Sequence, residues 1–277
     1  MRTVTLPSGE EVPVLGQGTW RMGESSARRK LEIAALRSGL DLGLSVIDTA
    51  EMYADGGAEK VVGEAILGRR DKVFLVSKVL PQHATKAGTI KACERSLARL
   101  RTDRLDLYLL HWPSNIALDE TLSGFASLVA AGKIRYWGVS NFDLRDMEEL
   151  MSLRDGHAVA TDQVLYNLGR RGIERDLLPW CAERHVPLMA YSPIEQGRML
   201  KRSELKEVAA RRGATPAQVA LAWVLHREGI LAIPKMGSVE HVEENHGALK
   251  LSLTSAELDQ LEAAFPLPAE KVGLEVL

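Results

Sequence analysis

Short apolar runs alternate with longer amphipathic segments from Leu15 onward. The run VFLVSK is almost wholly apolar, which is typical of a strand buried on both faces, whereas apolar residues recur at helical spacing in Ala27–Leu42. The strands predicted in this way are LGQGT from Leu15, Val46–Asp48, Val73–Lys78, Leu105–Trp112, Ile134–Asn141, Val159–Gln163, Val186–Ser192 and Ile230–Lys235. The predicted helices are Ala27–Leu42, Glu59–Leu67, Lys86–Leu100, Asp119–Ala130, Asp143–Leu153, Glu174–Arg184, Ser203–Arg211, Pro216–Arg227, Val239–Leu249 and Ser255–Phe265.

Eight apolar strands that alternate with helices favour an α/β fold of the closed (β/α)8 type, the TIM barrel, over a doubly wound sheet. Ahead of them, Val4–Val14 alternates around Pro7-Ser8-Gly9 and predicts a small β-hairpin. No linker or low-complexity segment divides the chain, so residues 1–277 are predicted to form a single domain.

Gly16 and Gly18 could belong to a dinucleotide-binding loop of the Rossmann type. The third glycine of that motif is replaced by Arg21, and no acidic residue follows at the expected offset. We therefore reject a Rossmann interpretation of this segment.

Composition narrows the classes of function. A net charge of −2 gives no reason to expect a nucleic-acid or acidic-membrane partner, and no secretion signal or membrane-spanning run is apparent. The two cysteines lie far apart in helical patterns, and the seven histidines show no HxH or HExxH pair. We expect a cytoplasmic protein without disulfides or metal, and the sequence leaves its oligomeric state open.

Polar side chains end most of the predicted strands. In order along the chain they are Asp48, Lys78, His111, Asn141, Gln163, Tyr191 or Ser192, and Lys235. Each alone is more often a structural residue than a functional one. In a closed parallel barrel, however, all of these positions face the same mouth, where such folds place their chemistry. The recurrence therefore predicts one active site.

Tyr53, in the loop after Val46–Asp48, can donate a proton to an oxygen that gains negative charge. Asp48, Lys78 and His111 from the strand ends can assist it. A free tyrosine has a pKa of about 10. A neighbouring Lys78 ammonium, paired with Asp48, is expected to lower the pKa of Tyr53, and His111 can hydrogen-bond a substrate oxygen. A carbonyl that accepts hydride gains such a charge, and a nicotinamide cofactor must supply the hydride because side chains cannot.

The ordered motifs LGQGTW, VIDTAEMY with GGAEKVVGEAI, SKV, LLHWP, GVSNF, Gln163, YSPIEQG and IPK…EN resemble the aldo-keto reductase family over essentially the whole chain. Each motif alone is weak, but their order and spacing are specific. The resemblance implies reduction of small aldehydes and ketones with NADPH, or alternatively NADH, as cofactor. It implies that Tyr53 is the general acid/base, that Lys78 and Asp48 tune it, and that His111 helps to place the carbonyl.

The resemblance also implies a cofactor site. Ser140, Asn141 and Gln163 would hold the carboxamide and Tyr191 would stack on the nicotinamide. The pyrophosphate would lie near Ser192 and the loop to Gln196, the 2′-phosphate near Lys235 and Ser238, and the adenine near Glu244 and Asn245. The further implied cofactor contacts are Gly18, Thr19, Trp20, Asp48, Pro193, Ile194, Gly197, Ile233, Pro234 and His241. The implied substrate pocket consists of Trp20, Met22, Met52, Tyr53, His111 and Trp112.

The chain departs from the family pattern in three places. His241 stands where many members carry an arginine and Met236 where they carry a serine, so a preference for NADPH would rest mainly on Lys235. The chain is short after Asn245, which predicts a more open substrate mouth.

Two rival functions are a cofactor-sensing regulatory subunit on the same barrel and a Schiff-base lyase using Lys78. The second needs a neutral lysine, which Asp48 disfavours.

Overall fold

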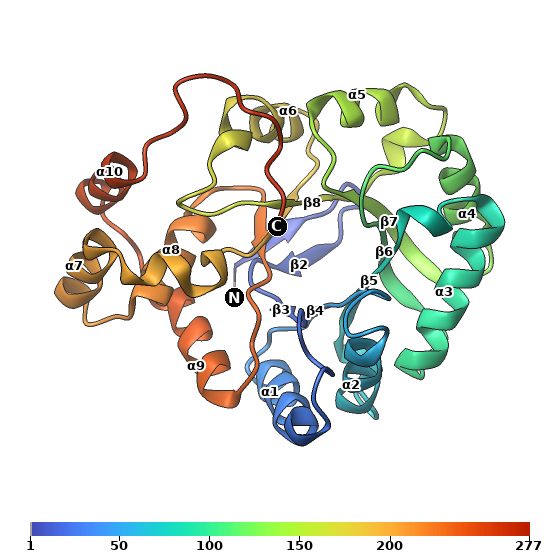
Figure 1. Cartoon of the computed structure of the whole chain (residues 1–277), viewed down its shortest axis with the longest axis horizontal. Coiled ribbons are helices and arrows are strands. Elements are labelled where there is room, and N and C mark those ends of the chain that lie inside the picture. The colour runs from blue at the N-terminus through green and yellow to red at the C-terminus, as the bar shows by residue number, and fades with distance from the viewer. Residues whose placement is uncertain (1) are drawn as a thin grey trace.

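The computed structural model describes residues 2–277, and its eight parallel strands form one sheet in the order β3 to β10 (Figure 1). The strands are β3 Gln17–Gly18, β4 Val46–Asp48, β5 Phe74–Val79, β6 Leu105–Leu110, β7 Ile134–Ser140, β8 Asp162–Leu165, β9 Leu188–Tyr191 and β10 Ile230–Ala232. The sheet closes on itself, because Gly16 N–H donates to Ala232 O at 2.8 Å and Gly18 N–H donates to Pro234 O at 2.9 Å. The predicted (β/α)8 barrel is confirmed.

Helices surround the strands (Figure 1). They are α1 Arg29–Asp41, α2 Gly57–Ala65, α3 Lys86–Leu100, α4 Leu118–Ala130, α5 Leu144–Ser152, α6 Leu177–Glu183, α7 Ser203–Arg212, α8 Pro216–His226, α9 Val239–Gly247 and α10 Ser255–Ala264. Their ends follow local chemistry: α8 begins with Pro216 at its first position and a reciprocal cap between Thr215 and Gln218. Every residue of β5 and β6 is buried, as expected when the barrel interior is filled and helices cover the outside.

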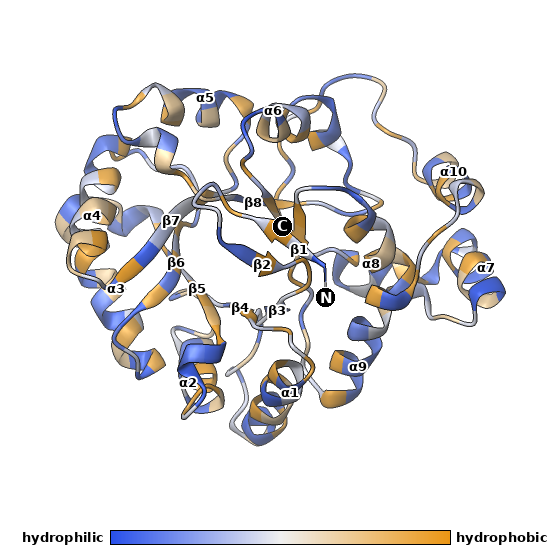
Figure 2. Cartoon of the chain, turned by 180° about the vertical axis from the view of Figure 1, so that it is seen from behind, coloured by the Kyte–Doolittle hydropathy of each residue, from blue (hydrophilic) through white to orange (hydrophobic). Residues whose placement is uncertain are grey.

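The predicted hairpin forms from β1 Thr3–Thr5 and β2 Glu11–Pro13, which pair antiparallel. Glu10 in its turn accepts hydrogen bonds from Arg135 (2.6 Å) and from the Tyr136 hydroxyl (2.7 Å) at the start of β7. The hairpin therefore lies at the amino ends of the strands. In Figure 2 the outer helices carry alternating hydrophilic and hydrophobic bands, which is the pattern of amphipathic helices.

The largest differences from the predicted strand boundaries, three residues each, are at the start of β8 and the end of β10. The strand expected at Val159–Gln163 begins only at Asp162, because a 3-10 turn occupies Gly156–Ala158, so Gln163 is its second residue and not its last. The last strand, β10, ends at Ala232, and Pro234 just beyond it has no N–H to continue a ladder. Within residues 2–277 no helix is long and apolar enough to cross a membrane, and Cys93 and Cys181 are free and buried.

Candidate active site

Lys78 is the centre of the site at the carboxyl ends of β4 and β5. Its ammonium donates to Asp48 Oδ2 at 2.8 Å, to the Thr49 carbonyl at 2.9 Å and to the Tyr53 hydroxyl at 3.1 Å. The Lys78 side chain is 0% exposed, and these three partners use all three of its N–H donors. The structure thus brings together three residues that the sequence spreads over thirty positions.

Asp48 is held on both oxygens. Oδ2 pairs with Lys78, and Oδ1 accepts from Gln163 Nε2 at 2.8 Å across the barrel. Gln163 can reach Asp48 because the second residue of β8 faces the barrel interior, level with Met189 of β9. In the structure the Gln163 amide therefore contacts the carboxylate, in addition to the carboxamide role that the resemblance implies.

Tyr53 is carried by a tight loop between β4 and α2. Ala54, Asp55 and Gly56 all adopt positive φ values, which turn the chain back toward the start of α2. The Tyr53 ring meets the edge of Trp20 at 5.2 Å and of His111 at 5.8 Å between centroids. Its hydroxyl oxygen accepts from Lys78, which leaves the phenolic hydrogen available to donate.

Glu51 anchors the same loop, and sequence reasoning missed it. This buried carboxylate accepts from Leu80 N–H at 2.9 Å, contacts His83 Nδ1 at 2.8 Å and accepts from Arg95 at 3.3 Å. All three partners lie after β5, so Glu51 ties the loop that carries Tyr53 to the segment that follows the Lys78 strand. Its position two residues before Tyr53 was the available signal.

The pKa of Tyr53 differs in direction from the prediction. Burial raises it above the ordinary value, and this effect outweighs the opposing influence of the Lys78 ammonium. The expected lowering is therefore wrong for the protein without a bound ligand, since the sequence does not show how deeply the phenol is buried. Burial alone would lower the pKa of Lys78, but the Asp48 carboxylate raises it, so the lysine remains charged.

His111 follows β6 directly and lies beside Tyr53. Burial, and secondarily the Lys78 charge, lower its pKa to about 2, so the imidazole is neutral. Its ring stacks on Trp112 with centroids 3.8 Å apart, and its buried Nδ1 has no hydrogen-bond partner within residues 2–277. A neutral imidazole at this position can hydrogen-bond a carbonyl oxygen without adding charge.

A chain of hydrogen bonds runs along the mouth from β7 to β9. Ser140 Oγ donates to Gln163 O at 2.8 Å, Asn141 Nδ2 donates to His111 O at 3.0 Å, and the Tyr191 hydroxyl donates to Asn141 Oδ1 at 2.9 Å. Asn141 has a φ of 60°, in the left-handed region that asparagine tolerates. Residues predicted to contact the nicotinamide thus share one network.

The loop after β9, predicted near the pyrophosphate, has an unusual backbone. Positive φ values occur at Ser192, Glu195, Gln196 and Gly197, around Pro193 and Ile194. Asn167 holds this loop by donating to Ser192 O at 3.0 Å and to Glu195 Oε2 at 2.8 Å. Strained backbone of this kind is concentrated at ligand-binding segments.

The residues predicted near the adenosine end lie between β10 and α9. Ser238 caps α9 by accepting from His241 N–H at 3.4 Å, and Glu244 O accepts from Gln218 at 3.0 Å. Asn245 is buried in the same helix. Gly18 approaches this segment so closely that an added Cβ would lie 2.5 Å from Ile233 O, which explains the glycine there. Thr19 is buried and donates to Asp48 O at 2.9 Å.

Not every predicted pocket residue faces the mouth. Trp20 is 42% exposed and Met52 is 36% exposed, consistent with positions at a substrate entrance. Met22 is 0% exposed and belongs to the hydrophobic core. The turn after Thr19 directs this side chain inward, with Met22 N–H bonded to Thr19 O at 2.9 Å.

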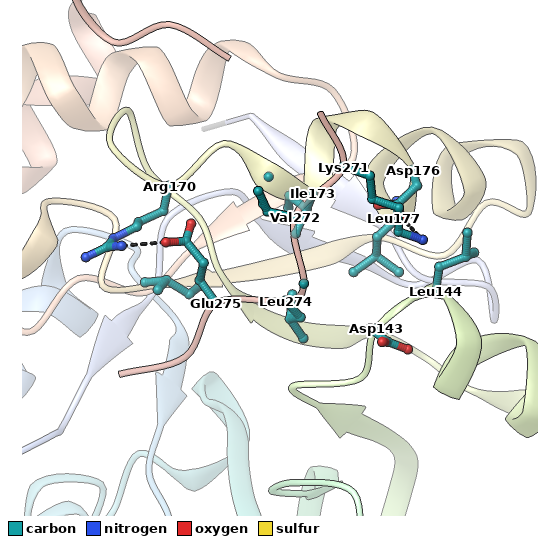
Figure 3. Close-up of a pocket in the computed structure, with 13 residues that line it drawn as sticks. Asp143, Leu144, Arg170, Ile173, Asp176, Leu177, Lys271, Val272, Leu274 and Glu275 are labelled. Carbon is teal, nitrogen blue, oxygen red and sulfur yellow. Dashed lines mark hydrogen bonds and ion pairs between the residues drawn. The ribbon is translucent and has the colours of Figure 1, made fainter. Parts of the chain in front are cut away.

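The carboxy-terminal segment 266–277 crosses the mouth, against the expectation of an open one. Lys271, Val272, Leu274 and Glu275 line a small cavity with the loops after β7 and β8, and Glu275 pairs with Arg170 at 2.5 Å (Figure 3). The chain ends near Tyr191: burial raises the pKa of the Tyr191 hydroxyl, and the Leu277 backbone acts in the opposite direction. The small number of residues after Asn245 predicted an open mouth. A segment in extended conformation, however, covers a long distance with few residues.

No cluster of three or more metal-ligating side chains occurs in the described part of the chain. The site contains one buried ion pair, one phenol and one neutral imidazole. This set can bind an oxygen, donate a proton to it and stabilise the phenolate left behind.

Comparison with known proteins agrees with this chemistry. A model of the Aldo/keto reductase family matches residues 14–265. The chain is 55% identical over 271 residues to methylglyoxal reductase YeaE of Escherichia coli, covering 96% of this chain and 95% of that protein. It is 32% identical to glyoxal reductase of Bacillus subtilis, covering 94% and 92%. An aldo-keto reductase from Klebsiella pneumoniae in complex with NADPH superposes with a TM-score of 0.98 at 54% identity, covering 100% and 99%.

Proposed function

Because this chain belongs to the aldo/keto reductase family, we propose that it reduces small aldehydes and ketones to alcohols with NADPH. In this proposal residues 1–277 act as a single barrel domain. Bound in the mouth, the nicotinamide would supply the hydride to the carbonyl carbon. The observation that carries the proposal is the 3.1 Å contact between Lys78 Nζ and the Tyr53 hydroxyl, inside a buried ion pair with Asp48.

Tyr53 donates the proton in this mechanism. Its oxygen accepts from Lys78, so its hydrogen points to the substrate oxygen, where negative charge develops as the carbonyl is reduced. The O–H bond of the alcohol forms as the Tyr53 O–H bond breaks, and the new C–H bond would come from the hydride. The Lys78 ammonium then stabilises the phenolate until a proton from solvent restores it, and neutral His111 holds the same substrate oxygen.

The cofactor contacts are supported by the side chains present. Tyr191 offers a half-buried ring at the end of β9, and Ser140, Asn141 and Gln163 provide amide and hydroxyl groups beside it. At the other end, Lys235 has no ion-pair partner within 4.0 Å among residues 2–277 and Ser238 lies at the start of α9. An unpaired ammonium beside a helix amino end is suited to a phosphate.

We further propose that the substrates are small 1,2-dicarbonyls such as methylglyoxal and glyoxal. Two relatives, 55% and 32% identical to this chain, are named for these compounds. The last residues of the chain lie near Tyr191, and we expect them to leave more room for a short substrate than for a bulky one. Parallel assays of methylglyoxal, glyoxal, longer ketones and sugars with NADPH and NADH test this directly.

The decisive experiment is Tyr53→Phe. We expect turnover of methylglyoxal to fall by about 10² to 10⁴-fold, as for the loss of a general acid, while NADPH affinity measured by fluorescence stays within a factor of about two. Tyr108→Phe is the matched control, because Tyr108 is also buried but its hydroxyl has no hydrogen-bond partner in the described chain. Full activity in Tyr53→Phe, or no NADPH turnover in the wild type, would refute the proposal. The second result would instead favour a cofactor-sensing protein.

A further inference from the structure

Arg28 joins two segments that are far apart in the sequence. It ends the 3-10 turn Ser26–Arg28 ahead of α1, and its Nη2 donates to Gly237 O at 3.4 Å in the loop between β10 and α9. The contact links the segments that precede α1 and α9, two helices that lie side by side in the barrel wall (Figure 1). Arg28 thereby reaches the segment that carries Lys235 and Ser238.

The Arg28 and Lys235 cations converge on Gly237. A Cβ added to Gly237 would lie 3.1 Å from Lys235 Nζ and 3.5 Å from Arg28 Nη2, so both charges face the same small region. Among residues 2–277, Lys235 forms no ion pair within 4.0 Å, and Arg28 meets only Glu32, at 3.8 Å.

Glu32 fixes the direction of Arg28. This carboxylate is 1% exposed, accepts from Gly23 N–H at 3.0 Å and faces the Nε edge of the Arg28 guanidinium. Nη2, on the same edge of the guanidinium as Nε, donates to Gly237 O, so this edge is held between Glu32 and the segment that carries Lys235. A planar guanidinium held in this way can donate two parallel hydrogen bonds to one oxyanion, which a lone ammonium cannot do.

We propose that Arg28 is the second cation of the site for the adenosine 2′-phosphate, and that Arg28 and Lys235 together set a preference for NADPH over NADH. The inference rests on the proposed function, which places the 2′-phosphate at Lys235. A phosphate carries about −1.5 to −2 charges near neutral pH, whereas NADH has only a hydroxyl at that position. His241 and Met236 stand where many members of the family carry an arginine and a serine, and Arg28 would supply a guanidinium from another element.

The electrostatics of Lys235 agree with this geometry. Burial first, and then the neighbouring Arg28 charge, lower the pKa of Lys235. Two cations that repel one another in the free protein are relieved when a dianion lies between them. The site is thus arranged for an anion rather than for a neutral ribose.

The test measures binding and not turnover. Dissociation constants for NADPH, NADH, 2′,5′-ADP and 5′-AMP are determined by calorimetry for the wild type and for Arg28→Ala. We expect NADPH and 2′,5′-ADP to bind about 10- to 100-fold more weakly to the variant, with NADH and 5′-AMP changed less than about twofold. Arg28→Lys should recover part of the loss, because it keeps the charge but not the fork.

Arg29→Ala is the matched control. Arg29 is adjacent and carries the same charge, but it pairs with Glu64 of α2 at 2.9 Å, so its loss should leave the ratio of NADPH to NADH affinity unchanged. An Arg28→Ala variant that weakens all four ligands alike, or none, overturns the assignment. If the wild type prefers NADPH and that preference survives in Arg28→Ala, this inference alone fails. If the wild type binds neither dinucleotide, the proposed function fails and this inference with it.

Discussion

Replacing Lys78 by methionine tests the ion pair on which the site is built. Methionine fills a similar volume but removes the ammonium and its three hydrogen bonds to Asp48, Thr49 and Tyr53. The Asp48 carboxylate, 2% exposed, is then left without its counter-charge and keeps only the Gln163 hydrogen bond. Removing one partner of a buried ion pair strands a charge in a medium that solvates it poorly.

The expected cost follows from that burial. Loss of one member of a buried pair lowers the free energy of unfolding by about 3–5 kcal/mol. The double variant Asp48→Asn with Lys78→Met leaves no buried charge, and the remaining loss is the orphaned Thr49 carbonyl, about 1–3 kcal/mol. The double variant should therefore be more stable than Lys78→Met alone, although both should be inactive.

Urea unfolding of the wild type, both single variants and the double variant gives this cycle directly. Lys91→Met, on the exposed face of α3, is the control and should change stability by no more than about 0.5 kcal/mol. The reasoning is refuted if Lys78→Met costs less than about 1 kcal/mol, or if the double variant is as unstable as the two single losses added together.

The pH dependence has a definite sign. The pKa of Lys78 is raised above its ordinary value of 10.5 in the folded protein, so its stabilising contribution is fully present below that value. It is lost as the pH rises through the higher folded pKa. The stability difference between wild type and Lys78→Met should thus be constant from about pH 7 to 10 and shrink above that range.

Three further predictions concern the surroundings of the site. Because the pKa of His111 is lowered to about 2, its ring resonances in NMR should show no titration between about pH 5 and 8, and a midpoint near 6.5 would contradict the burial described. Glu51→Ala should lower turnover while sparing NADPH affinity, with a stability loss of about 1–3 kcal/mol from the orphaned amide, and unchanged turnover would show that this anchor does not position Tyr53. Glu275→Ala breaks a half-exposed ion pair with Arg170, so the free energy of unfolding should fall by less than about 1 kcal/mol. The carboxy-terminal segment should nevertheless exchange its amide hydrogens faster. An unchanged exchange rate would show that the Glu275–Arg170 pair does not hold this segment.

Much of the architecture could be predicted from local pattern. The alternation of apolar runs with amphipathic segments predicts the barrel, because a strand covered on both faces must be apolar throughout. The structure agrees, since β5 and β6 are buried at every position. The meeting of Asp48, Lys78 and Tyr53 also followed, since the carboxyl ends of parallel strands share one mouth. These are regularities of periodicity and topology, which a linear sequence records.

What the sequence could not supply depends on how distant segments enclose one another. The depth at which Tyr53 is buried, and hence the direction of its pKa shift, is set by Trp20, His111 and the loops around them. The inward turn of Met22 and the contact of Arg28 with Gly237 are likewise products of packing. Desolvation and charge interactions sum over every neighbour in space, and neighbours in space emerge only once the barrel has closed.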